Sequence, residues 1–329
     1  MKAFLDLVRW KNLVIVILTM TLMRYAIIAP LLDKINVVLA SGIGLEEPMK
    51  LQMPWYDFAI LVLATVLITA GGYVINDYFD IKTDLINRGE VLVGTKIPRR
   101  KAILWHSILN VAGITAGFYV SWKAGYLWLG TLFLLVSGLL YFYSASYKRQ
   151  FLIGNLIVAI LTAMVPMLVV IYEWPAIYKY YQLHAEVTPK FDLIIYWVGG
   201  FALFAFLTTL TREIIKDIED FEGDMAYGRN TVPVIIGVNS ARIVAISLVL
   251  ITALLLYLVW YFFINDWITF IYLTIFVVFP LIFVIYKLTR DTDKRQMHGA
   301  SNLMKIVMLT GILYSVIVKI ILSLNLFNQ

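Results

Sequence analysis

The chain has 329 residues, of which 61% are hydrophobic and 15% are charged, and its mean hydropathy is +0.85. Soluble globular domains carry about 25% charged residues, so this composition excludes a soluble protein. The chain has no cysteine and only three histidines, which excludes a disulfide framework and a cysteine-ligated metal. Any bound metal is therefore expected to be held by oxygen atoms.

Nine apolar runs are each long enough to cross a bilayer. A spanning helix needs roughly 20 mostly apolar residues, because the hydrocarbon core is about 30 Å thick and each helical residue rises about 1.5 Å. The first run carries Arg24 and lacks a small-residue cleavage pattern, so it is expected to be a true span and not a signal peptide. The sequence thus predicts an all-α polytopic membrane protein, a single domain over 1–329 with nine transmembrane helices in a bundle. The predicted spans are 13–32, 57–75, 102–121, 125–144, 151–172, 192–211, 241–263, 267–286 and 303–325.

Lysine and arginine residues fall mostly on one side of these spans. If the N-terminus is cytoplasmic, the cytoplasmic side carries 20 of the 27, the opposite side carries six, and Arg24 lies within a span. Cytoplasmic loops keep a positive excess, so the N-terminus is predicted to be cytoplasmic. The net charge of +6 then reflects topology and contact with anionic membrane lipids, and no feature indicates nucleic-acid binding.

Acidic residues concentrate in two stretches, one after the second span and one after the sixth. The first reads Asn76-Asp77-Tyr78-Phe79-Asp80-Ile81-Lys82-Thr83-Asp84, and the second reads Asp217-Ile218-Glu219-Asp220-Phe221-Glu222-Gly223-Asp224. In both, aspartates at relative positions 0, 3 and 7 would share one helical face within an arc of roughly 60°. The motifs are 140 residues apart, which matches a block of four spans. Spans 2–5 and 6–9 are therefore predicted to form a weak internal repeat.

Packing these two acidic faces together would gather six carboxylates. Like charges at short range repel and raise each other's pKa, so a cation is needed between them. Magnesium ions are bound through a few carboxylates, retained waters and substrate phosphates. A solvated helix end is the alternative interpretation of either motif alone, but two matched copies favour Mg²⁺ bridging a diphosphate to the protein. The predicted catalytic and metal-ligating residues are Asp77, Asp80, Asp84, Asp217, Asp220 and Asp224.

Several basic and aromatic side chains near the motifs are candidates for anion binding. Arg212 and Lys216 lie on one i, i+4 stripe leading to Asp220. Arg24 is expected to face the bundle interior, because an unpaired charge within a span is costly; contact with substrate and contact with a neighbouring helix are both open. The position of Tyr143 is explained equally well by an aromatic belt and by ligand contact.

These motifs resemble those of the UbiA superfamily of intramembrane prenyltransferases, and the resemblance covers nearly the whole chain. Residues 76–84 match the family pattern N-D-x-x-D-x-x-x-D, residues 143–149 are similar to its tyrosine and lysine segment, and Gly154-Asn155 also fits. Residues 212–224 are similar to the digeranylgeranylglyceryl phosphate synthases of that superfamily. This chain has Asn87-Arg88-Gly89-Glu90 where the family commonly has Asn-Arg-Pro.

The resemblance implies an enzyme that transfers an isoprenyl group, here geranylgeranyl, from its diphosphate donor to a lipid acceptor such as geranylgeranylglyceryl phosphate. Magnesium on the six aspartates would neutralise the leaving diphosphate, and the bundle would shield the allylic cation from water. No general base is identified. The implied substrate-binding residues are Asn76, Arg88, Tyr143, Lys148, Arg212 and Lys216.

Two alternatives stay open at this stage. An aromatic-acid prenyltransferase of quinone biosynthesis would use the same donor chemistry with an aromatic acceptor, and a polytopic transporter would also have nine spans. Transport sites usually lie near the bilayer midplane, whereas these acids lie at one edge. The expected location is the cell (inner) membrane, with the active site on the cytoplasmic side.

Overall fold

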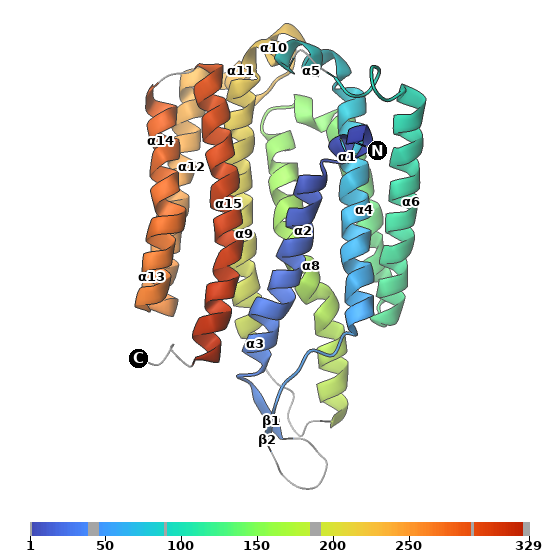
Figure 1. Ribbon diagram of the computed structural model, residues 1–329, viewed down its shortest axis with the longest axis vertical. Helices are drawn as coiled ribbons and strands as arrows, with labels where there is room; N and C mark the ends of the chain where they lie inside the picture. Colours follow the sequence, from blue (N-terminus) through green and yellow to red (C-terminus); the bar gives the residue numbers. More distant parts are fainter. Residues whose placement is uncertain (1, 39–45, 89–90, 185–191, 291–292, 325–329) are drawn as a thin grey trace.

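The computed structural model describes residues 2–38, 46–88, 91–184, 192–290 and 293–324, and most of them are helical (Figure 1). Within these ranges nine helical segments are long and apolar enough to cross a membrane. All nine predicted spans are confirmed. The segments are Trp10–Leu32, Trp55–Phe79, Arg99–Lys123, Leu127–Ala145, Ile153–His184, Asp192–Glu219, Val238–Ile264, Trp267–Arg290 and Lys294–Ser323.

Short α, 3₁₀ and π segments adjoin or interrupt several of the spans. The N-terminal half contains α1 (Lys2–Leu7), α2 (Trp10–Leu22), η1 (Met23–Ile28), α3 (Ala29–Leu32), α4 (Trp55–Phe79), α5 (Ile81–Arg88), α6 (Arg99–Lys123), η2 (Leu127–Gly130), α7 (Thr131–Ala145), η3 (Tyr147–Arg149) and α8 (Ile153–His184). The C-terminal half contains α9 (Asp192–Glu219), α10 (Phe221–Ala226), α11 (Val232–Ile236), α12 (Val238–Val259), η4 (Trp260–Ile264), α13 (Trp267–Leu273), η5 (Thr274–Val278), α14 (Phe279–Arg290) and α15 (Lys294–Ser323).

Three helices extend well beyond the apolar runs that predicted them. Helix α8 continues to His184, α9 continues to Glu219, and α15 begins at Lys294. Hydropathy detects only residues suited to hydrocarbon, whereas a helix continues for as long as its backbone hydrogen bonds do. The extension of α9 matters most, because it places Asp217 inside a helix.

The two ends of the bundle differ in structure. Helices α5, α10 and α11 lie together at one end, here called the acidic end, and α1 lies toward that end (Figure 1). The strands β1 (Asn36–Val38) and β2 (Glu46–Pro48) lie at the opposite end, here called the hairpin end, where they pair antiparallel with Asn36 opposite Pro48. Which end faces the cytoplasm stays a prediction from the loop charges.

Two large clusters of buried side chains hold the bundle together. The first includes Met20, Leu61 and Tyr172, and the second includes Ile214 and Val284. Helix α9 contributes to both clusters and packs against α8, α12 and α15. Burying apolar side chains between helices therefore fixes the position of the α9 motif relative to the rest of the bundle.

Arg24 forms a buried ion pair toward the hairpin end. Its Nε lies 2.9 Å from Oε2 of Glu173, and the two side chains are only 3% and 1% exposed. Arg24 also donates to the carbonyl of Met53, while Glu173 Oε1 accepts from the backbone N–H groups of Gln52 and Met53 at 3.1 and 2.9 Å. The prediction that Arg24 faces the interior is confirmed, and its partner is on a neighbouring helix.

Removing the Glu173 carboxylate is expected to destabilise the fold. Glu173→Ala leaves a buried guanidinium and two backbone N–H groups without an acceptor, and breaking a buried pair in this way costs about 3–5 kcal/mol. Thermal unfolding of the purified protein in detergent measures the loss. The double variant Arg24→Met/Glu173→Gln removes both charges and keeps an acceptor for Gln52 and Met53, so it should be more stable than Glu173→Ala. Equal stability of Glu173→Ala and wild type would contradict this account.

Candidate functional site at the acidic end

Each acidic motif contains a helix break at its middle aspartate. Asp80 separates α4 from α5 with φ −89° and ψ 0°, and Asp220 separates α9 from α10 with φ −94° and ψ 7°. The prediction that the three aspartates of each motif share one helical face assumed an unbroken helix. That assumption is wrong, because each helix ends at the middle aspartate. The two breaks have nearly the same backbone geometry, and α5 packs against α10. The two motifs are therefore alike in backbone conformation as well as in sequence. The four-helix repeat stays a prediction.

One arginine joins the two motifs. Nη2 of Arg229 lies 2.7 Å from Oδ1 of Asp80, and Nη1 lies 3.3 Å from Oδ1 of Asp224. Arg229 also donates to the Thr83 hydroxyl at 2.6 Å. Asp80 and Asp224 are both buried, so these contacts are charge-assisted hydrogen bonds in a shielded place. The two acidic helix ends meet at the guanidinium of Arg229, while Mg²⁺ binding by the six aspartates stays a prediction.

Lys148 is a second cation on Asp80. Its Nζ lies 2.7 Å from Asp80 Oδ1 and donates to Asn76 Oδ1 at 3.2 Å. Burial alone would raise the pKa of Asp80, but the charges of Lys148 and Arg229 hold it below its usual range. Burial lowers the pKa of Lys148 to about 8, although the Asp80 carboxylate opposes that shift. The segment after α7 is thereby tied to the first motif.

The leading aspartate of each motif contacts a different helix. Oδ2 of Asp217 accepts from the Asn155 amide of α8 at 2.8 Å. Oδ1 of Asp77 accepts from Nη2 of Arg9, at the start of α2, at 2.8 Å. Four separate parts of the chain, α2, η3, α8 and the segment after α10, thus supply polar partners to the motif aspartates.

The other predicted residues are placed less directly. The charges of Glu213, Asp80 and Asp217 act on the Tyr143 hydroxyl, so Tyr143 lies close to the motifs. Arg212 forms an ion pair with Glu213 at 2.6 Å. Lys216 makes no ion pair or hydrogen bond within the described ranges. Arg88 ends α5, but its side chain lies outside the part of the chain that the structure describes.

Arg229, Arg9, Thr83 and Asn155 contact the motifs and were not predicted as site residues. A signal for Arg229 was present, because it follows Asp217 by 12 residues and Arg88 follows Asp77 by 11. Applied to single residues, the predicted offset of 140 would have placed the counterpart of Arg88 at Gly228, one residue before Arg229. No comparable signal exists for Arg9, which reaches Asp77 only because α2 packs beside α4.

The carboxylates fit a hard divalent cation in their chemistry. Within the described residues, no three acidic or histidine side chains are close enough to hold an ion by themselves. Magnesium usually completes its shell with water and substrate phosphate oxygens, so a partial carboxylate set suffices. Burial raises the pKa of Asp224 to about 6; Arg229 opposes this shift and the charge of Asp220 adds to it. A bound cation would oppose this shift and favour the charged carboxylate.

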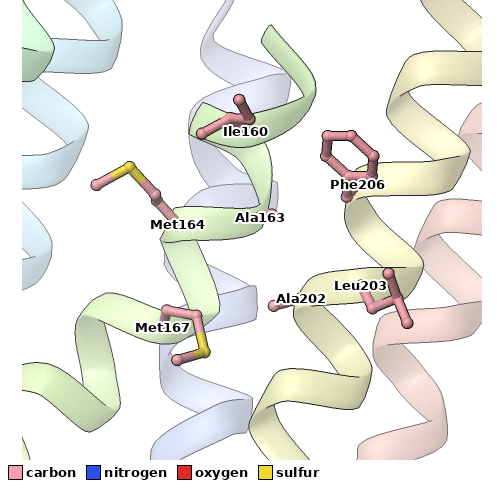
Figure 2. Close-up of a pocket in the computed structure, with 7 residues that line it drawn as sticks. All are labelled: Ile160, Ala163, Met164, Met167, Ala202, Leu203 and Phe206. Atoms are coloured by element: carbon pink, nitrogen blue, oxygen red, sulfur yellow. The ribbon is translucent and has the colours of Figure 1, made fainter. Parts of the chain in front are cut away.

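Two apolar cavities lie along α9. One of about 240 Å³ lies between α8 and α9 (Figure 2). Another of about 660 Å³ lies among α9, α12, η5 and α15, and Leu203 borders both. No charged side chain lines either cavity, so each suits a hydrocarbon chain. The first is lined by Ile160, Ala163, Met164, Met167, Ala202, Leu203 and Phe206.

Comparison with known proteins gives consistent matches. The model of the UbiA prenyltransferase family matches residues 49–309. A digeranylgeranylglyceryl phosphate synthase of Methanosphaera stadtmanae is 34% identical over 259 residues, which cover 77% of this chain and 85% of that protein. The digeranylgeranylglyceryl phosphate synthase of Thermococcus kodakarensis is 30% identical over 291 residues, which cover 87% and 95%.

Solved structures agree with this fold. A structure of a digeranylgeranylglyceryl phosphate synthase has a TM-score of 0.60 at 23% identity and covers 96% of this chain and 98% of its own. A UbiA homolog from Archaeoglobus fulgidus bound to GPP and Mg²⁺ has a TM-score of 0.55 at 15% identity and covers 95% and 99%. At these identities the likeness establishes the architecture.

The placement of Lys148 is expected to depend on Gly154. A Cβ at Gly154 would lie 2.7 Å from Cα of Lys148 and 3.2 Å from the Tyr147 carbonyl. Gly154→Ala should therefore displace η3, with an overpacking cost of about 1–3 kcal/mol. Thermal unfolding and hydrogen exchange over residues 146–153 check this. Gly138→Ala on α7, where a Cβ meets nothing within 4 Å, is the matched control; equal behaviour of the two variants would refute the steric argument.

Proposed function

This chain belongs to the UbiA prenyltransferase family, and on that premise we propose that it transfers a geranylgeranyl group from its diphosphate to geranylgeranylglyceryl phosphate. Family membership makes it an integral membrane enzyme that transfers prenyl groups. The observation that carries the proposal is that Arg229 joins the two acidic motifs, with Lys148 paired to Asp80 beside it, at one end of an apolar bundle. The curated relatives that bear the synthase name support this acceptor.

The acidic end would bind the diphosphate of the donor. Arg229 and Lys148 pair with motif aspartates and would also contact the diphosphate there, since a guanidinium suits bidentate contact with phosphate oxygens. Asn76, already fixed by Lys148, would orient the diphosphate, and Tyr143 and Arg88 would border it. Magnesium ions on Asp77, Asp80, Asp84, Asp217, Asp220 and Asp224, when bound, would neutralise the negative charge of the leaving diphosphate. The presence of GPP and Mg²⁺ in a UbiA homolog supports this requirement.

The remaining chemistry rests on positioning and on exclusion of water. The bond between the allylic carbon and the diphosphate oxygen breaks, the acceptor hydroxyl oxygen bonds to that carbon, and the hydroxyl proton is released. The apolar bundle shields the reacting carbon, because a water molecule there would give the alcohol instead of the ether. The apolar cavities along α9 suit long hydrocarbon chains. No residue is assigned as a general base.

The loop charges support an orientation with the acidic end on the cytoplasmic side of the cell (inner) membrane. That side would give direct access to water-soluble headgroups and Mg²⁺. Membership of a prenyltransferase family sets the transporter alternative aside. Transfer to an aromatic acid of quinone biosynthesis differs only in the acceptor and is an outcome of the test below.

Product analysis tests the proposal directly. The detergent-solubilised protein is incubated with geranylgeranyl diphosphate, Mg²⁺ and either geranylgeranylglyceryl phosphate or 4-hydroxybenzoate, and products are identified by mass. The expected product carries a second geranylgeranyl chain on the glyceryl phosphate, and excess chelator abolishes its formation. Prenylation of 4-hydroxybenzoate alone would assign the enzyme to quinone synthesis.

Asp220→Asn is expected to lower turnover while leaving the protein folded. The substitution keeps the size of the side chain but removes one charge from the proposed metal site, and loss of such electrostatic stabilisation costs about 100-fold or more. Glu222→Gln, an exposed acid on the adjacent α10, is the control and should retain turnover. The measurement is the steady-state transfer rate of each variant at saturating Mg²⁺. Near-normal turnover of Asp220→Asn would show that Asp220 is not part of the metal site.

A further inference from the structure

One contact shows the register in which α9 and α15 pack against each other. The two helices are antiparallel neighbours (Figure 1), and Nδ1 of His298 on α15 lies 2.9 Å from Oε1 of Glu219 on α9. Both helices rise by the same distance per residue. Lys305 is seven residues beyond His298, and Arg212 is seven residues before Glu219. Lys305 therefore lies level with Arg212, about two turns from the Glu219–His298 contact, and its side chain is exposed.

The cations at this level have unused hydrogen-bonding capacity. Arg212 contacts Glu213 through Nη1, but its Nε is buried and has no hydrogen-bond partner. Within the described ranges Lys216 has no ion pair, and Lys305 makes its one hydrogen bond, 2.9 Å long, to the neutral amide of Asn302. The charges of Arg212 and Lys216 both act on Lys305. Three cations thus lie near one another on α9 and α15 with two carboxylates: Glu213 pairs with Arg212, and Glu219, which pairs with His298, also acts on Lys305.

We propose that Arg212, Lys216 and Lys305 form a binding site for a phosphate monoester, and that its ligand is the phosphate headgroup of the acceptor lipid. This inference rests on the proposed function. A phosphate monoester carries a charge of about −1.5 to −2 and three strong acceptor oxygens. These oxygens would satisfy Nε of Arg212 and pair with both lysines. A phosphate bound there would complete the local charge balance that the protein itself leaves incomplete.

The position of this site separates the two anionic groups of the reaction. Arg212 precedes Asp220 by eight residues, or about 12 Å along a helix. A donor diphosphate at the aspartates would use Lys148 and Arg229, and an acceptor phosphate would use Arg212 and Lys305. Lys216, whose charge acts on both Lys148 and Lys305, would lie between the two anions. An aromatic acid or a neutral lipid alcohol lacks the dianion, and the cluster would therefore select for a phosphorylated acceptor.

Binding measurements without donor and without Mg²⁺ test the site independently of turnover. Thermal stabilisation of the detergent-solubilised chain is titrated with geranylgeranylglyceryl phosphate, with geranylgeranylglycerol and with inorganic phosphate. We expect the lipid phosphate to bind more tightly than the alcohol or inorganic phosphate. Inorganic phosphate binding as tightly as the lipid phosphate would overturn the assignment to a lipid headgroup.

Variants of α15 make the test specific. Lys305→Met should weaken binding of the lipid phosphate about tenfold or more, the order expected for losing one charged hydrogen bond, and Lys305→Arg should restore much of it. Lys319→Met, which removes a lysine near the other end of the same helix, should bind as wild type does. Unchanged binding by a folded Lys305→Met variant would overturn the inference.

A kinetic comparison separates failure of the inference from failure of the proposed function. In the transfer assay, Lys305→Met should raise KM for the phosphorylated acceptor and leave KM for the diphosphate donor unchanged. An equal rise in both values would place Lys305 at the donor and overturn the inference. If wild type transfers to no phosphorylated acceptor, the proposed function fails, and the binding titration still decides whether a phosphate site exists.

Discussion

The structure depends on a shared charge at the acidic end, where Asp80 accepts from both Lys148 and Arg229. These two cations come from segments that follow different spans, and Arg229 also reaches Asp224 of the other motif. A buried carboxylate is costly unless its charge is matched and its oxygens are hydrogen-bonded. The need to satisfy Asp80 therefore brings together the ends of α4, α7 and α10, which the apolar packing of the spans alone would not specify.

The position of α9 connects this polar network to the apolar bundle. Its Val198 packs in the first buried cluster and its Ile214 packs in the second. Its far end carries Asp217, which Asn155 of α8 holds by a hydrogen bond. Along α9, the side chains thus change from apolar residues that line the cavities, to the cations Arg212 and Lys216, to the aspartates of the second motif. Substrates with a long apolar tail and a phosphate head have the same order of polarity, which is why this helix is central to the proposed chemistry.

Much of the fold and part of the site could be predicted from the sequence. Apolar runs identify spans reliably because hydrocarbon imposes one demand on every residue of a run, and all nine runs are helices here. The spacing of the aspartates correctly suggested that two helix ends meet. The breaks at Asp80 and Asp220 and the polar ends of α8 and α15 were not predicted, because they depend on local backbone geometry. Arg9 and Asn155 reach the motifs through packing between distant spans, which no single segment encodes.

The Arg24–Glu173 pair gives the two halves of the molecule different mechanical characters. If this pair near the hairpin end were separated, both charges would be left buried without a partner, which is costly. That half of the bundle is therefore expected to stay rigid during turnover. At the acidic end Asp80 pairs with both Lys148 and Arg229, so an arriving anion can take one of these cations while the other keeps Asp80 paired. Conformational change during each catalytic cycle should therefore be confined to the acidic end of the bundle, while the hairpin end keeps its structure.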